Sequence, residues 1–207
     1  MELILVFVPM IYLWFGEYQN LPANERFFAS LFQAVTPRTA GFNTTDYNAF
    51  SGTGIVMTII LMLIGGAPGS TAGGMKITTI AVLFFTMVAF FKHEKSPAIF
   101  KRRVTNEAVA GAVAIFMLDL LITVFGAMAI AKIENIAFMR TLFESASAVA
   151  TVGLTMGITT RLSTISKIIL ILLMYTGRVG GMTLVFAAIT RKSLGNRQYP
   201  ADNIAVG

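Results

Sequence analysis

Residues 55–91 read IVMTIILMLIGGAPGSTAGGMKITTIAVLFFTMVAFF, two apolar runs joined by a glycine-rich stretch at 65–74. As one continuous helix, residues 51–91 would be about 60 Å long, twice the ~30 Å hydrocarbon core of a bilayer. The helix is therefore predicted to break within the glycine-rich stretch. Backbone that is not helical at that depth is tolerated only where it lines a cavity or is buried in protein.

The composition of the whole chain is that of a membrane protein. Of its 207 residues, 56% are apolar and 13% are charged, and the mean hydropathy is +0.75, whereas soluble domains carry about 25% charged residues. The lack of cysteine excludes disulfides, thiolate metal sites and a cysteine nucleophile, and a single histidine leaves little for metal or acid–base chemistry. We therefore expect no enzyme activity and no covalent cofactor.

The positive charge indicates an orientation in the membrane. The net charge is +6, and the basic residues lie largely between apolar segments, which fits topology in a bilayer better than binding to nucleic acid. Residues 92–103 (KHEKSPAIFKRR) hold five basic residues and are expected in the cytoplasm, as is the polar tail. Residues 43–48 and 157–162 are then expected outside the cell.

Five further segments are expected to be helical. The apolar run 3–15 is short for a span, and we interpret it as the end of a spanning helix whose beginning is not in the sequence. Residues 109–131 form a full-length span, and residues 26–35 and 138–150 are helices too short to cross a bilayer. A final span at 165–189 is predicted to be interrupted at TGRVGG, residues 176–181.

The same order of segments occurs twice, as span, short helix, glycine-containing loop and interrupted span. LFQAVTPRTAGFN (31–43) aligns with LFESASAVATVGLT (142–155) if one residue is gapped, and MLIGGAPGSTAGGM (62–75) aligns with LMYTGRVGGM (173–182). Both copies begin and end on the basic side, so the repeats are parallel. The predicted fold class is an all-α membrane protein with repeats at 1–91 and 107–192, a cytoplasmic basic loop at 92–106 and a cytoplasmic tail at 193–207.

Each short helix is followed by a Thr-x-Gly loop that suits a permeating cation. Extended backbone carbonyls can replace the water shell of an ion, the carboxyl end of the helix adds partial negative charge, and glycine permits the required backbone angles. The alternative is a plain loop between a surface helix and a span. The candidate ion-binding residues are Thr39, Ala40, Gly41, Phe42 and Asn43 in the first loop and Thr151, Val152, Gly153, Leu154 and Thr155 in the second.

Several stretches closely resemble the Ktr/Trk superfamily of potassium transporters, nearest to the membrane subunit of Ktr systems. They are ASLFQAVTPRTAGFNTTD (29–46), GGAPGSTAGGMKITT (65–79), and ATVGLTMGITTRLS (150–163) with GRVGGMTLVFA (177–187). The resemblance covers nearly the whole chain. It implies a subunit with four M1–pore helix–M2 repeats around one pore, of which this chain corresponds to the third and fourth.

The resemblance also implies a function and partners. It implies uptake of K⁺, often stimulated by or coupled to Na⁺, through a multi-pass protein of the bacterial plasma membrane. The implied partners are the two N-terminal repeats of the same subunit, a second copy in a homodimer, and a cytosolic regulatory ring that binds nucleotides. K⁺ in the filter is the only metal ion expected, and Gly41 and Gly153 take the positions of filter glycines.

The resemblance makes the glycine-rich stretch an intramembrane gate below the filter, and close helix packing through small residues is the alternative. The gate residues would be Gly65, Gly66, Ala67, Gly69, Ser70, Thr71, Gly73 and Gly74. Arg178 takes the position of a basic residue near the gate. It is expected either to pair with Asp119 or Glu144, or to be a fixed charge in the pore, since an unpaired arginine at that depth costs at least ~2.5 kcal/mol. Lys76 is either a second such charge or reaches cytoplasmic water.

Two acidic residues and one competing function complete the expectations. Glu144 lies nine residues before Gly153 and is expected either to accept N–H bonds from the filter loop or to attract cations at the surface. Asp119 is expected to pack against a polar group of a neighbouring helix. An alternating-access cation carrier also uses broken helices, but the parallel repeats and short pore helices favour a pore.

Overall fold

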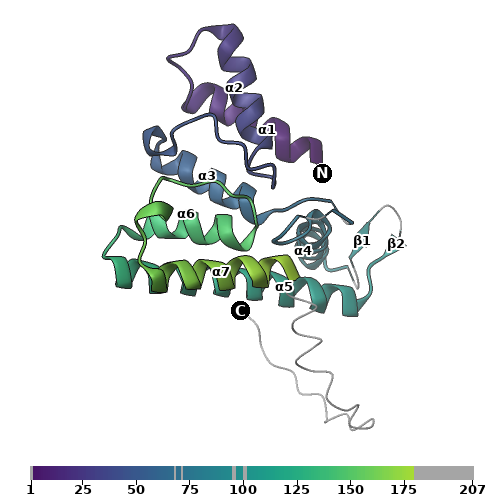
Figure 1. Ribbon diagram of the computed structural model, residues 1–207. Helices are drawn as coiled ribbons and strands as arrows, with labels where there is room; N and C mark the ends of the chain where they lie inside the picture. Colours follow the sequence, from purple (N-terminus) through teal and green to yellow (C-terminus); the bar gives the residue numbers. More distant parts are fainter. Residues whose placement is uncertain (1, 68, 71, 95–96, 100–101, 180–207) are drawn as a thin grey trace.

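The computed structural model describes residues 2–67, 69–70, 72–94, 97–99 and 102–179 (Figure 1), and these residues are almost entirely helical. The first half contains α1 (Glu2–Gly16), α2 (Ala23–Val35), the short 3₁₀ helix η1 (Tyr47–Ala49), α3 (Gly52–Leu63) and α4 (Ile77–Phe91). The second half contains α5 (Asn106–Glu134), α6 (Phe138–Val149), the 3₁₀ helix η2 (Thr159–Arg161) and α7 (Thr164–Val179). The predicted helices are therefore present within a few residues of their expected bounds, except that the predicted end of the span 165–189 lies outside the described residues.

The predicted break in the first long apolar segment is confirmed. Helix α3 ends at Leu63 and α4 begins at Ile77, so the chain is non-helical between them. The two ends of this loop are joined, because the N–H of Gly65 donates to the carbonyl of Met75 over 2.8 Å and the N–H of Met75 donates to the carbonyl of Leu63 over 3.2 Å. The loop thus leaves and re-enters the helical path at nearly the same point.

Two expectations about secondary structure need correction. The second interruption does not begin at Thr176, because the chain stays helical to Val179; the rest of that predicted interruption and the tail lie outside the described residues. The basic segment is not a plain loop, because β1 (Ala98–Ile99) and β2 (Arg102–Arg103) form a short antiparallel pair within it. This pair returns the chain directly from α4 toward α5.

Helix α6, which belongs to the second half, packs against helices of both halves. Helix α6 packs against α5, α7 and α3, while α2 packs against α1. In Figure 1, α5 and α7 run side by side at the bottom, α6 and α3 lie above them, and α1 with α2 forms the upper part. Among the described residues, α5 is the one helix long and apolar enough to cross a membrane by itself; α1, α3 and α4 are shorter apolar helices.

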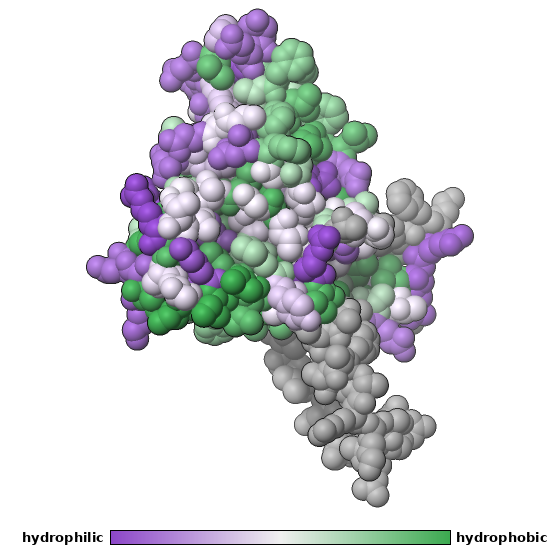
Figure 2. Space-filling model, viewed as in Figure 1, coloured by the Kyte–Doolittle hydropathy of each residue, from purple (hydrophilic) through white to green (hydrophobic). Residues whose placement is uncertain are grey.

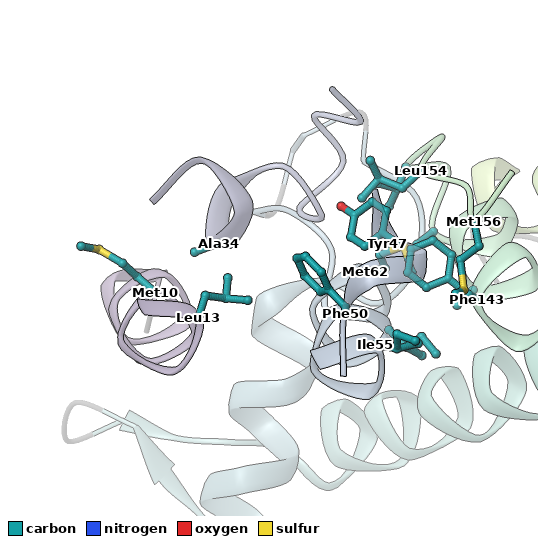
Figure 3. Packing of buried hydrophobic residues seen from close by; sticks show 14 of the residues in the cluster. Met10, Leu13, Ala34, Tyr47, Phe50, Ile55, Met62, Phe143, Leu154 and Met156 are labelled. Carbon is teal, nitrogen blue, oxygen red and sulfur yellow. The ribbon is translucent and has the colours of Figure 1, made fainter. Parts of the chain in front are cut away.

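The main core joins the first half to the loop that follows α6. Buried residues from α1, α2, α3 and α6 meet there (Figure 3), among them Leu13, Ala34, Met62 and Phe143, with Leu154 of the second Thr-x-Gly loop. Large apolar side chains are exposed along α1, α4, α5 and α7, and Figure 2 shows such patches at the top and at the bottom of the view. Apolar surface of this extent suits lipid or further transmembrane helices.

Both halves contain the same kind of contact, in which a carboxylate at or just after the end of the first helix bonds to the serine that precedes the helix following the Thr-x-Gly loop. The Glu17 carboxylate, just after α1, accepts from the N–H of Ser51 over 3.0 Å and from its hydroxyl. The Glu134 carboxylate, at the end of α5, accepts from the N–H of Ser163 over 2.9 Å and from the hydroxyls of Ser163 and Ser166. Carboxylates are stabilising at helix N-termini, where backbone N–H groups point outward.

Candidate functional site

The two Thr-x-Gly loops have the same unusual backbone. Thr39 and Gly41 have φ angles of +66° and +75°, and Thr151 and Gly153 have φ angles of +54° and +91°. A left-handed threonine is uncommon because its Cβ crowds the backbone, and such residues cluster at functional sites. Both loops therefore alternate left-handed residues with ordinary ones at the positions that the sequence alignment equates.

Each loop is anchored to the end of its own short helix. In the first, the N–H of Gly41 donates to the carbonyl of Thr36 over 3.0 Å, and the Thr36 hydroxyl donates to the carbonyl of Phe42 over 2.6 Å. In the second, the N–H of Val152 donates to the carbonyl of Ser147 over 2.9 Å, and the N–H of Gly153 donates to the Ser147 hydroxyl over 3.1 Å. In each loop, a residue is thus bonded to the hydroxyl of the residue six positions earlier in the chain.

The two loops touch each other through backbone. A Cβ atom at Gly41 would lie 2.0 Å from the carbonyl oxygen of Val152, so only glycine allows this approach. At Gly153 a Cβ would meet nothing within 4 Å, so this glycine faces open space. That space is a cavity of about 740 Å³ lined by Glu144, Ser147, Ala148, Thr151, Gly153, Leu154, Thr155, Thr159, Leu170, Met174, Tyr175 and Arg178.

The helix break between α3 and α4 lies directly against the second loop. The N–H of Gly73 donates to the Thr151 hydroxyl over 3.1 Å, and a Cβ at Gly73 would lie 2.9 Å from the carbonyl oxygen of Ala150. The Lys76 ammonium donates to the carbonyls of Ser70 and Ala72 over 2.9 and 2.8 Å. Lys76 therefore holds the loop of the break, and of the predicted gate residues only Thr71 lies outside the described residues.

Comparison with known proteins identifies the family to which this arrangement belongs. The TrkH family, described as a cation transport protein, matches residues 10–196. The chain belongs to the TrkH family. The TrkH family is a family of transporters, not of enzymes, and its membrane transporter fold agrees with the helical architecture.

Individual relatives agree with this assignment. The chain is 38% identical to the Ktr system potassium uptake protein B of Bacillus subtilis, over 97% of the chain and 46% of the relative. It is 41% identical to the potassium/sodium uptake protein NtpJ of Enterococcus hirae, over 88% of the chain and 42% of the relative. The crystal structure of the potassium transporter TrkH from Vibrio parahaemolyticus superposes with a TM-score of 0.75 at 22% identity, over 92% of this chain and 42% of that one. The chain thus spans under half the length of these proteins and shares the fold of the matching part.

Arg178 of this TrkH-family chain lies beside the carboxyl end of α6. It lines the same cavity as Thr151, Gly153 and Glu144. The preceding residue, Gly177, packs so closely on α6 that a Cβ there would lie 1.7 Å from the carbonyl oxygen of Val149. A guanidinium near the negative end of a helix is stabilised by its dipole.

Glu144 supports the second loop by accepting hydrogen bonds, as the first of its two alternatives predicted. It is only 4% exposed, and its carboxylate accepts from the N–H of Met156 over 3.1 Å, from the Thr159 hydroxyl over 2.8 Å and from the Thr155 hydroxyl. Asp119 is buried within α5 and is not among the residues that line the cavity.

Several contacts in this site were missed by the sequence analysis. The positions of Thr36 and Ser147 in the sequence could have indicated their role, because each lies near the end of a short helix that precedes a Thr-x-Gly loop. Gly177 was also visible in the sequence, but TGRVGG was interpreted as a break in the helix, whereas Gly177 permits close packing of α7 on α6. The bond between Gly73 and Thr151 joins residues 78 positions apart, and no local pattern announces it.

Proposed function

We propose that this chain forms part of the pore of a transporter that takes up K⁺ across the bacterial plasma membrane, with stimulation by Na⁺. The family assignment supports cation transport, and the names of the two relatives supply the ions, potassium for one and potassium/sodium for the other. The observation that carries the proposal is the pair of Thr-x-Gly loops with matching left-handed angles that meet at Gly41 and Val152.

The proposed ion path runs along these loops. The ligands are backbone oxygens of residues 39–43 and 151–155, because an alternation of left-handed and ordinary residues turns successive carbonyls toward one side, where they replace the hydration shell of K⁺. The open space beside Gly153 supports this role, since a glycine without neighbours at that position leaves the backbone accessible. K⁺ is a transported ion here and not a resident cofactor.

The proposed gate is the helix break at residues 65–74. It lies against the second filter loop, to which the N–H of Gly73 joins it through the Thr151 hydroxyl, while Lys76 bonds to Ser70 and Ala72 within the break itself. Breaking a hydrogen bond such as that between Gly73 and Thr151 costs about 0.5–1.5 kcal/mol, which is within the range of a regulatory partner. Arg178, on the wall of the same cavity, is proposed as a fixed charge that acts with this gate.

The length of the relatives supports the proposal that further repeats precede this chain, since it spans 46% and 42% of the two named above. Repeats at 1–91 and 107–192 are the third and fourth of four parallel M1–pore helix–M2 repeats, and the preceding two complete the pore. The complete subunit, meaning this chain joined to those two repeats, forms a homodimer and binds a cytosolic nucleotide-binding ring. Residues 92–106 and 193–207 face the cytoplasm.

The test is K⁺ uptake by the complete subunit in bacteria that lack their own K⁺ uptake systems. We expect growth at low external K⁺ and saturable K⁺ uptake that increases when Na⁺ is added. Gly153→Ser should weaken the apparent K⁺ affinity or admit Na⁺ without reducing the amount of subunit in the membrane. Uptake and selectivity that are unchanged in both Gly153→Ser and Gly41→Ser would show that these loops are not the filter.

A further inference from the structure

The short helix η1, which lies between the first filter loop and α3, contacts both halves of the chain. Its residue Tyr47 is 1% exposed and is among the largest fully buried side chains of the described residues. Its neighbour Asn48 is exposed and points the other way, toward the outer end of the second loop. One turn of helix therefore reaches both short helices and the second filter loop.

Tyr47 joins α2 to α6 behind the filter loops. Its hydroxyl accepts a hydrogen bond from the Gln33 amide of α2, and its ring lies 4.9 Å from the ring of Phe143 of α6 (Figure 3). Gln33 is itself 1% exposed, and its amide oxygen has no partner among the described residues. The bond to Tyr47 is thus the side-chain contact that fixes the Gln33 amide. The Tyr47 ring in turn packs against Phe143, so Tyr47 links α2 to α6.

Asn48 joins the first half to the second loop at its outer end. Its Nδ2 donates to the carbonyl of Met156 over 3.2 Å and to Oδ1 of Asp46 over 2.8 Å. Both neighbours are acceptors, so the amide must present its N–H groups to them. The N–H of Asn48 also donates to Asp46 Oδ1 over 2.9 Å, which fixes the backbone that carries the side chain.

Met156 is consequently held from two sides by different repeats. Its N–H donates to Glu144 of its own short helix, and its carbonyl accepts from Asn48 of the first repeat. The residue directly before it, Thr155, is the last of the second filter loop. A change in the position of η1 is therefore transmitted to that loop through one peptide unit.

We propose that η1 is a strut that sets the spacing between the two filter loops, and that Tyr47 and Asn48 are positioning residues for ion selectivity. The inference rests on the proposed function and adds the residues that determine its specificity. A filter selects K⁺ over Na⁺ through the number and placement of its oxygens. Displacing one loop relative to the other changes that placement without removing any ligand.

The test compares K⁺ and Na⁺ uptake by the complete subunit for Asn48→Asp, Asn48→Ala and Tyr47→Phe. Asn48→Asp places a carboxylate oxygen against the Met156 carbonyl, and Tyr47→Phe leaves the Gln33 amide without its partner. Each should lower the ratio of K⁺ to Na⁺ uptake at least threefold, with Asn48→Asp the largest effect. Asn20→Asp, the same charge change in the exposed loop between α1 and α2, and Tyr12→Phe should leave the ratio unchanged.

The outcomes separate this inference from the proposed function. If the unmodified subunit takes up no K⁺, the proposed function fails. If it does, and both Asn48 variants keep the K⁺ to Na⁺ ratio within twofold, the strut is overturned while the function stands. Asn48 is exposed, so its variants decide the question even if Tyr47→Phe prevents the subunit from reaching the membrane.

Discussion

Adding one methyl group at each filter glycine should have two different effects. Gly41 and Gly153 both have left-handed backbone angles, so alanine at either position costs about 1–2 kcal/mol. At Gly41 the new Cβ would also lie 2.0 Å from the carbonyl oxygen of Val152, which must retreat by more than about 1 Å to restore contact distance. Overpacking of this kind costs about 1–3 kcal/mol more. Gly153 has no such neighbour within 4 Å.

The complete subunit carrying Gly41→Ala should therefore be destabilised by about 2–5 kcal/mol, and Gly153→Ala by about 1–2 kcal/mol. Since 1 kcal/mol shifts the melting temperature by roughly 2–4 °C in a protein of about 200 residues, and less in a larger one, heating of the purified subunit should resolve the two variants. The effect on K⁺ uptake should be clearest in Gly153→Ala. This variant remains folded but narrows the proposed ion path, so its apparent K⁺ affinity should fall.

The matched control is Gly52→Ala, at the first residue of α3, where a Cβ also meets nothing within 4 Å and φ is ordinary. It should leave stability and uptake unchanged or raise stability slightly, since alanine favours helix over glycine. The reasoning is refuted if Gly41→Ala is no less stable than Gly153→Ala, because the contact between the two loops would then not exist.

Three further predictions concern the proposed gate, the contact between α7 and α6, and the charge of Glu144. Lys76→Met removes both bonds from its ammonium to the helix break, so K⁺ flux should rise and depend less on the regulatory ring, whereas unchanged flux would exclude Lys76 as a latch. Gly177→Ala would place a Cβ 1.7 Å from a backbone oxygen of α6, while Gly126→Ala meets only the flexible Leu173 side chain at 2.7 Å, so Gly177→Ala should lose far more thermal stability. Glu144→Gln removes the charge but keeps one acceptor oxygen. The K⁺ concentration for half-maximal uptake should therefore rise about tenfold, a change of ~1.4 kcal/mol, with little change in maximal rate. An unchanged concentration would show that the charge does not act on the ion.

Length and glycine content were enough to predict where the first long segment breaks. Forty-one residues cannot form one spanning helix, and only the glycine-rich stretch at 65–74 separates the two apolar runs, so the break between Leu63 and Ile77 followed from length and composition. The same reasoning failed for TGRVGG as far as Val179. A single glycine within a helix is tolerated, and Gly177 is required by the approach of α7 to α6 and not by a change of direction.

Contacts between the two halves of the chain could not be predicted, because they depend on how distant segments meet. Asn48 and Met156 are 108 positions apart, and nothing in the sequence around Asn48 indicates its partner. The capping carboxylates Glu17 and Glu134 are different, since each lies at the end of a span and thirty or so residues before a serine that starts the next. That recurrence was visible in the sequence, but it acquires meaning only once the helices are placed.

If the two loops form the filter, as we propose, their contacts indicate that the second loop supports the first. The second loop is bonded to its own helix through Ser147 and Glu144, to the helix break through Thr151, and to η1 through Met156. The first loop is bonded to its own helix and rests against the second at Gly41 and Val152. Val152 directly follows Thr151, so a movement of the gate that breaks the bond to Thr151 changes the contact surface on which the first loop rests. Opening of the gate and a change in filter geometry are therefore expected to occur together, because one peptide unit separates the two contacts.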